Sequence, residues 1–279
     1  MTKLTSILVA TDLSTRSDRA VRRAAHIARA HGAALTVLTV MDDAMPAEVI
    51  DTLHAKTRAA LERFVGSVCV GVNVTIKAEP GDPTTDILHA CAGGIDLLVM
   101  GTHRVRPFLD LLRETTMQRI VRHTATPVLL VTDRADHHYV NVIAACDFSP
   151  ASSGAIRMAH AIADEAKIHP VHALNVPYAG RLSRTQAAGD AIEASFRKEA
   201  EASARSWLAS ETLPTAHMSD IEILPGSPLP ILRSKVELGD IDLVAVGAHG
   251  RVGSARSLLG SLATDLMRDP PCDVLIARP

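Results

Sequence analysis

The sequence predicts an α/β protein of two tandem domains, each an open parallel sheet of five strands flanked by helices. Two observations support this class. Short β-branched apolar runs alternate with helical patterns along the chain. Aromatic residues make up only 3% of the 279 residues, and the small aliphatic residues that dominate are typical of buried parallel strands.

A third observation, an internal repeat, divides the chain into two similar halves. "SILVATDLS" at 6–14 matches "NVIAACDFS" at 141–149, and "GIDLLVMGTH" at 94–103 matches "DIDLVAVGAH" at 240–249. Two further pairs of blocks follow the same order, namely 79–88 with 224–232 and 126–131 with 272–277. We therefore expect domains at 1–134 and 138–279, with a polar linker between them.

Each half should alternate strands and helices. The first half predicts strands near 5–11, 34–40, 72–78, 96–101 and 127–131, and helices near 15–31, 47–66, 83–92 and 115–123. Ser14 or Ser17 begins the first helix and Gly32 ends it. The second half repeats the pattern, with Ser149 capping a helix that has Pro150 at its first position. An inserted helix near 184–210 carries charges among Ala, Ile, Phe and Trp207, which indicates an amphipathic cover for the sheet.

Composition and charge exclude several classes of protein. The chain is 47% apolar and 22% charged with a net charge of −2, so nothing indicates a nucleic-acid surface. No apolar run approaches the roughly 18 residues of a membrane span, and no signal peptide is visible. Four cysteines form no CxxC pair, which favours buried thiols in a reducing compartment. These are Cys69, Cys91, Cys146 and Cys272. We expect a cytoplasmic protein.

The residues with binding chemistry stand at strand ends. The first strand of each half ends on an acid, Asp12 or Asp147, and the fourth ends on a glycine, Gly101 or Gly247. In open parallel sheets, ligands bind at the carboxyl ends of the strands where the strand order reverses. If the first and fourth strands are neighbours there, the acid and the glycine loop face one crevice.

The loop after Gly247 indicates a nucleotide site. Gly250 allows close approach of backbone to a ligand, and Gly260 with Ser261 opens a helix whose free N–H groups and dipole favour an anion. Asp147 accepts hydrogen bonds from a sugar hydroxyl or an amine. The loop is neither a P-loop nor a GxGxxG fingerprint.

These residues give both halves a resemblance to the universal stress protein family. The spacing G-x2-G-x9-G-[ST] of its ATP-binding members is matched by Gly247, Gly250, Gly260 and Ser261. The resemblance implies the strand order 3-2-1-4-5, adenosine near Asp147 and adenine near Val176. It also implies that the two fifth strands pair within the chain as a pseudo-dimer, with homodimerisation open.

The resulting prediction is a site for ATP, alone or with Mg²⁺, in the second domain. The residues predicted to bind it are Ala145, Asp147, Ser149, Val176, Gly247, His249, Gly250, Arg251, Gly260 and Ser261.

The first half departs from the pattern, with Arg104 and Glu114 where the second half has Gly250 and Gly260. Glutamate at a helix N-terminus is stabilised by the helix dipole and would repel a phosphate. Three interpretations stay open: a degenerate structural domain, a different ligand, or ATP despite the changes. A different ligand would be helped by a basic set, Arg104, Arg106, Arg113 and Arg119.

The function expected is a nucleotide-dependent binding or signalling module in stress response, with an unknown protein partner. The alternatives are a slow ATPase or nucleotidyl-transferring enzyme using the same crevice, and a scaffold that the nucleotide only stiffens. Thirteen histidines raise the question of a metal, but no zinc spacing occurs. A catalytic Cys146 is disfavoured because strand alternation turns it away from Asp147 into the core.

Overall fold

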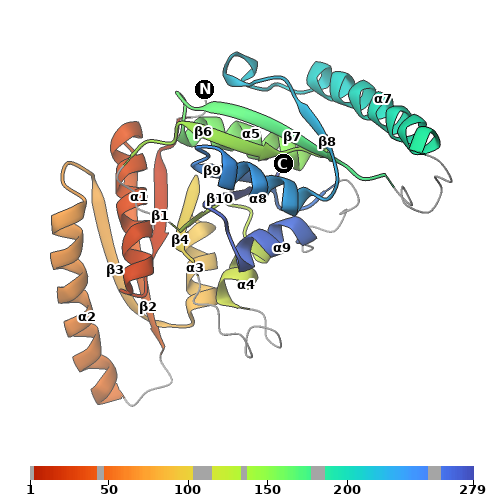
Figure 1. The fold of residues 1–279 in the computed structure, drawn as a ribbon. Coiled ribbons are helices and arrows are strands. Elements are labelled where there is room, and N and C mark those ends of the chain that lie inside the picture. The colour runs from red at the N-terminus through yellow and green to blue at the C-terminus, as the bar shows by residue number, and fades with distance from the viewer. Residues whose placement is uncertain (1–2, 43–46, 103–114, 133–136, 177–185, 251–258) are drawn as a thin grey trace.

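The computed structural model describes residues 3–42, 47–102, 115–132, 137–176, 186–250 and 259–279. Within these ranges ten strands form one sheet, in the order β3-β2-β1-β4-β5-β10-β9-β6-β7-β8 (Figure 1). Each half of the sheet is parallel and has the order 3-2-1-4-5. This confirms the predicted fold class and strand order.

The elements of the first half lie close to their predicted bounds. They are β1 (Ser6–Ala10), α1 (Thr15–His31), β2 (Ala34–Asp42), α2 (Ala47–Val68), β3 (Val74–Gly81), α3 (Pro83–Cys91), β4 (Leu97–Gly101), α4 (Thr116–His123) and β5 (Val128–Val131). Ser14 is the N-cap of α1 and accepts a hydrogen bond from the Ser17 amide, and Gly32 ends the helix in the left-handed conformation at φ 63°.

The second half repeats this order with one long insertion. Its elements are β6 (Asn141–Ala145), α5 (Pro150–Ile162), β7 (Lys167–Leu174), α7 (Gln186–Ser210), the short 3-10 helix η1 (Thr215–His217), β8 (Glu222–Pro225), α8 (Pro228–Leu238), β9 (Leu243–Gly247), α9 (Ser261–Arg268) and β10 (Asp273–Ala277). Ser149 caps α5 as predicted, with Pro150 in its first turn.

Helices cover both faces of the sheet and enclose two cores. Buried side chains of α1, α2, α5 and α7 pack in one apolar cluster, and those of α3, α4, α8 and α9 pack in another on the opposite face. In α7, Trp207 is 5% exposed and its indole N–H donates to Ser153 Oγ at 2.9 Å. These contacts support the interpretation of the inserted helix as a cover.

The two halves join at their fifth strands. β10 pairs antiparallel with β5, with Leu275 opposite Leu129. The predicted pairing within one chain is thereby confirmed, and the tandem domains form an intramolecular pseudo-dimer. Otherwise each fifth strand would expose an unpaired edge. The domain bounds stay a prediction, because 133–136 lies outside the described residues.

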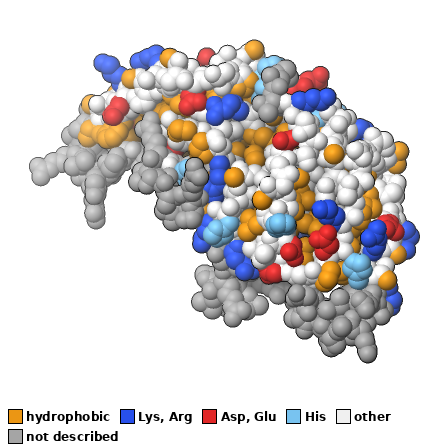
Figure 2. Space-filling model, turned by 180° about the vertical axis from the view of Figure 1, so that it is seen from behind, with side chains coloured by type: hydrophobic (Ala, Val, Ile, Leu, Met, Phe, Trp, Pro, Cys, Tyr) orange, Lys and Arg blue, Asp and Glu red, His pale blue; other side chains and the backbone are white. Residues whose placement is uncertain are grey.

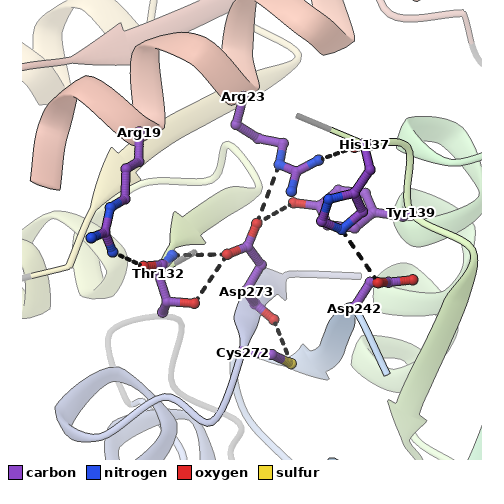
Figure 3. A network of polar contacts seen from close by, with 8 residues as sticks. All are labelled: Arg19, Arg23, Thr132, His137, Tyr139, Asp242, Cys272 and Asp273. Carbon is purple, nitrogen blue, oxygen red and sulfur yellow. Dashed lines mark hydrogen bonds and ion pairs between the residues drawn. The ribbon is translucent and has the colours of Figure 1, made fainter. Parts of the chain in front are cut away.

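A buried polar network fastens this joint (Figure 3). Asp273 Oδ2 lies 3.3 Å from Arg23 Nε and accepts from the Tyr139 hydroxyl at 2.6 Å, and its Oδ1 accepts from the Thr132 amide at 2.8 Å. The Arg23 guanidinium also lies 4.3 Å from the centre of the Tyr139 ring and donates to the His137 carbonyl. Helix α1, both fifth strands and the start of the second half therefore meet at one carboxylate.

The outer surface is mixed in charge. On the described part of the face in Figure 2, Lys and Arg side chains are interspersed with Asp and Glu side chains, in keeping with the net charge of −2. No helix within the described ranges has both the length and the apolar character needed to cross a membrane.

Candidate functional site

A cavity of about 230 Å³ lies at the carboxyl ends of β6, β7 and β9. β6 is hydrogen-bonded to both β7 and β9, so this is the point where the strand order of the second half reverses. Helices α8 and α9 complete its wall. The predicted residues that line it are Ala145, Asp147, Gly247, His249, Gly250, Gly260 and Ser261.

The Asp147 carboxylate is fixed from the protein side. Its Oδ1 accepts from Ser152 Oγ at 2.6 Å and from the Ser149 amide at 3.1 Å, and the Asp147 amide donates to Ser152 Oγ at 3.1 Å. Hydrogen bonds to the charged form favour an ionised carboxylate. Asp147 is therefore a preorganised acceptor on the cavity wall.

The turn that carries Asp147 contains a residue in an unusual conformation. Phe148 has φ 62° although it is not glycine, an arrangement that costs of order 1–3 kcal/mol and tends to occur at functional sites. Its ring is buried and stacks on His172, with centroids 4.4 Å apart. His172 Nδ1 in turn donates to the Cys146 carbonyl at 2.8 Å. This packing holds the strained turn in place.

The three glycines of the loop differ in what a side chain at their position would contact. A Cβ atom on Gly247 would lie 2.8 Å from Ala151 Cβ, so this glycine allows α5 to pack on the end of β9. On Gly250 it would lie 2.8 Å from Asp147 Oδ2. On Gly260 it would make only ordinary contacts, the nearest at 3.5 Å, and φ there is −65°. Neither the described packing nor the backbone thus requires glycine at 260.

The N-terminus of α9 faces the cavity without a side-chain cap. Gly260 is its N-cap residue and has no side chain with which to cap the first turn, and no other described side chain is seen to cap it. The four N–H groups at a helix start have no partner within the helix. The backbone here, together with Ser261, accordingly offers hydrogen-bond donors and the positive end of a helix dipole to an anion.

His249 adds a second polar group without a satisfied partner. Its Nδ1 is buried and makes no hydrogen bond with the residues the structure describes. In protein structures, the great majority of buried polar atoms have a hydrogen-bond partner. Because His249 lines the cavity, a ligand is a natural partner for this atom.

Two of the predicted site residues that the structure describes, Ser149 and Val176, do not line the cavity. Ser149 is buried beneath it as the cap of α5. Val176 lies two residues beyond the end of β7, and the cavity wall is formed instead by Ala173 and His172. Arg251 lies outside the described residues, as do Arg104 and Glu114.

The apolar wall and Ser152 were missed by the sequence prediction. Val171, Leu232, Val246 and Ala263 line the cavity as side chains of four different elements, and their convergence has no sequence signal. Ser152 did have one. The pattern D-x-S-x-x-S occurs in both halves, at 12–17 and 147–152, and its last serine holds the carboxylate in each.

The described histidines, cysteines and acids are spread over the structure. Among the residues that the structure places, no three His, Cys, Asp or Glu side chains come together as ligands of one metal ion. Cys146 is 5% exposed, and its carbonyl, not its thiol, is the group seen to accept from His172.

The structure thus defines a tandem α/β protein with a cavity at the carboxyl ends of the strands in each half. The model of the universal stress protein family matches residues 3–132 and again 138–278. The chain belongs to the universal stress protein family, as a tandem two-domain member.

Two kinds of relative are consistent with this assignment. A universal stress protein of Mycolicibacterium smegmatis is 26% identical, over 98% of this chain and 97% of that protein. A solved universal stress protein from Archaeoglobus fulgidus has a TM-score of 0.69 at 18% identity, covering 98% of both chains. A protein of unknown function from Pseudomonas aeruginosa has a TM-score of 0.59 at 18% identity, covering 99% of this chain and 93% of its own. The two solved structures share the fold.

Proposed function

We propose that the second half binds ATP at the cavity beside Asp147 and that the chain works as a nucleotide-dependent binding or signalling module in the cytoplasm. The observation that carries this proposal is the N-terminus of α9 at the cavity wall, where no described side chain caps the helix and the N-cap is a glycine that the described packing does not require. A phosphate group explains both features, because it needs free N–H donors and close approach to the backbone.

The cavity offers each part of ATP a matching surface. The apolar side chains Val171, Leu232 and Val246 suit the adenine ring. Asp147 suits the ribose hydroxyls as a fixed acceptor, and the phosphates lie toward Gly250, Gly260 and Ser261. This assignment places adenine against Ala173 rather than Val176, which does not line the cavity.

A Mg²⁺ ion that accompanies ATP would be bound by the phosphates of ATP and by water. Asp147 is the one carboxylate among the described residues that line the cavity, and two serines already hold its Oδ1. Mg²⁺ commonly keeps several waters and binds through substrate phosphates. The described side chains thus support ATP binding without building a dedicated magnesium site.

Titration calorimetry of ATP into the whole chain tests the proposal. We expect one ATP per chain. Asp147→Asn should weaken binding by about 10- to 150-fold, because a hydrogen bond to a charged group contributes about 1.5–3 kcal/mol. The matched control is Asp12→Asn in the first half, which should leave ATP binding unchanged. Two equivalent ATP sites, or no effect of Asp147→Asn, would contradict the proposal.

The second candidate function is slow ATP hydrolysis in the same crevice, and His249 is the observation that favours it. Its imidazole is a potential general base on the cavity wall. If the protein is a binding module, its rate of ATP hydrolysis should lie far below the typical enzyme range of about 1–1000 per second. A rate inside that range that His249→Ala abolishes would establish the enzyme instead.

A further inference from the structure

We propose that the first half holds a second ligand site, which takes an uncharged nucleoside rather than a nucleotide. The choice of a nucleoside rests on the proposed function of the second half, because the two cavities occupy equivalent places in the repeat. The site itself stands on residues of the first half alone.

A cavity of about 270 Å³ lies at the carboxyl ends of β1, β2 and β4. It is similar in volume to the cavity of about 230 Å³ in the second half. Asp12, Gly101 and Pro83 line it at the positions where Asp147, Gly247 and Pro228 line the other. The first half has therefore kept a cavity of similar volume at the equivalent place.

The acidic group of this cavity is held as firmly as its counterpart. Asp12 Oδ1 accepts from Ser17 Oγ at 2.7 Å and from the Ser14 amide at 3.0 Å. Thr11 Oγ1 donates to the same Ser17 hydroxyl at 2.9 Å. Partial burial raises the pKa of the Asp12 carboxyl, but hydrogen bonds from Ser14 and Ser17 outweigh it, and the pKa lies below the ordinary value of 3.8. A carboxylate ionised at neutral pH accepts hydrogen bonds from hydroxyl or amine donors.

Adjustable apolar side chains form much of the remaining wall. Leu38, Val40, Met100 and Met117 line this cavity, where Val171, Ala173, Val246 and Ala263 line the other. Unbranched methionine side chains adapt to the shape of a ligand and make favourable contacts with aromatic rings. An apolar ring with hydroxyl groups at one end matches this combination.

The anion subsite of the second half is closed in the first. Thr115 caps α4 by accepting from the Gln118 amide at 3.2 Å, and Gln118 Oε1 accepts from the Thr115 amide at 3.0 Å. This reciprocal capping box satisfies donors that a phosphate would use. In α9, by contrast, the N-cap is Gly260, and none of the described side chains caps the corresponding turn. The start of α4 therefore offers a phosphate fewer free N–H donors than the start of α9 does.

The test is a titration of the whole chain with two probes, adenosine and ATP. We expect two adenosine molecules but one ATP per chain. When ATP is present at saturation, it occupies the second half, and one adenosine should still bind. This measurement needs no variant and so does not depend on any variant folding. A chain that binds no adenosine once ATP is saturating would overturn the proposal.

Two matched variants assign the sites. Asp12→Asn should weaken the ATP-independent adenosine site by at least tenfold and leave ATP binding unchanged. Asp147→Asn should weaken ATP binding and leave that adenosine site unchanged. If Asp12→Asn lowers the melting temperature, Val40→Phe takes its place. This substitution narrows the cavity while Asp12 is unchanged, and it should also weaken the ATP-independent adenosine site.

The outcomes separate the two proposals. One outcome is a single ATP site that depends on Asp147, together with adenosine binding that neither Asp12→Asn nor Val40→Phe weakens. This outcome overturns the first-half site and leaves the proposed function standing. Two ATP sites, one of them lost in Asp12→Asn, also overturn the nucleoside assignment. Adenosine binding that depends on Asp12, with no ATP binding to either half, overturns the proposed function and supports the first-half site.

Discussion

Gly250 lies so close to Asp147 that a Cβ atom on the glycine would stand 2.8 Å from the Oδ2 atom of the carboxylate. The backbone at Gly250 is not left-handed, so this contact is the reason for the glycine that the structure shows. Gly250 is thus explained by the space that the Asp147 carboxylate occupies and not by an unusual backbone conformation.

Gly250→Ala should therefore weaken ATP binding by about tenfold, or about 1.4 kcal/mol. The added methyl group pushes a carboxylate that Ser152 and the Ser149 amide hold in place. A double-mutant cycle measured by calorimetry checks this mechanism. In an Asp147→Ala background the methyl group has no carboxylate to displace, and the further loss should vanish. An equal loss in both backgrounds would show that the methyl group acts on something other than Asp147.

Gly260→Glu should weaken ATP binding by about 5- to 1000-fold. A carboxylate about 4 Å from one phosphate charge costs roughly 1 kcal/mol in water-like surroundings and about 4 at an effective dielectric near 20. Gly260→Gln is the matched control, because it has the same size without the charge. Adenosine, which has no phosphate, should be affected much less by Gly260→Glu than ATP.

The melting temperature without ligand should hardly change in Gly260→Glu. A Cβ atom at this position makes only ordinary contacts, φ is −65°, and an acidic side chain at a helix start is favourable. If the folded variant binds ATP like the parent chain, the phosphates do not lie at the start of α9.

Asp273→Asn should be strongly destabilising. Arg23 and Asp273 have side chains that are each 2% exposed, and removing one partner of a buried ion pair costs about 3–5 kcal/mol. Urea unfolding measures the change. The control is Glu62→Gln, in the surface pair of Arg58 and Glu62, whose side chains are 53% and 50% exposed. Such a pair contributes about 0–1 kcal/mol. Equal effects of the two substitutions would contradict a structural role of the buried network.

Tyr139 should make the chain sensitive to alkali. Burial, with the nearby Asp273 carboxylate, raises the pKa of the Tyr139 hydroxyl well above its ordinary value of 10.0. Because the folded-state pKa exceeds the unfolded value, the stabilisation is fully present below about pH 10 and is lost as the pH rises above it. Tyr139→Phe should flatten the dependence of unfolding free energy on pH in this range. An unchanged alkaline slope in Tyr139→Phe would assign the loss to other groups.

The repeat and the local signals were sufficient to predict the fold class and the order of the elements, while the strand order came from the family resemblance. Apolar runs, the caps at Ser14, Gly32 and Ser149, and the acid and glycine at strand ends all act within a few residues, so the sequence shows them directly. The pairing of the fifth strands followed from the family resemblance.

The details of the candidate site depended on three-dimensional neighbours. The prediction named Val176, but Ala173 lines the cavity instead, and Val176 lies two residues beyond the end of β7 at Leu174. The capping box of Thr115 and Gln118 was also missed, although its residues are only three positions apart in the sequence. The network around Asp273 joins residues far apart in the chain, and no local pattern indicates such a contact.

The antiparallel pairing of β5 with β10 also determines where the two cavities open. Each half is parallel within itself, so all its strands end on one margin of the sheet, and the reversal at the joint puts those margins on opposite sides of the molecule. The two cavities therefore lie at opposite margins of the sheet and do not share a mouth. A single compact partner that covers the mouth of one cavity leaves the other open to solvent.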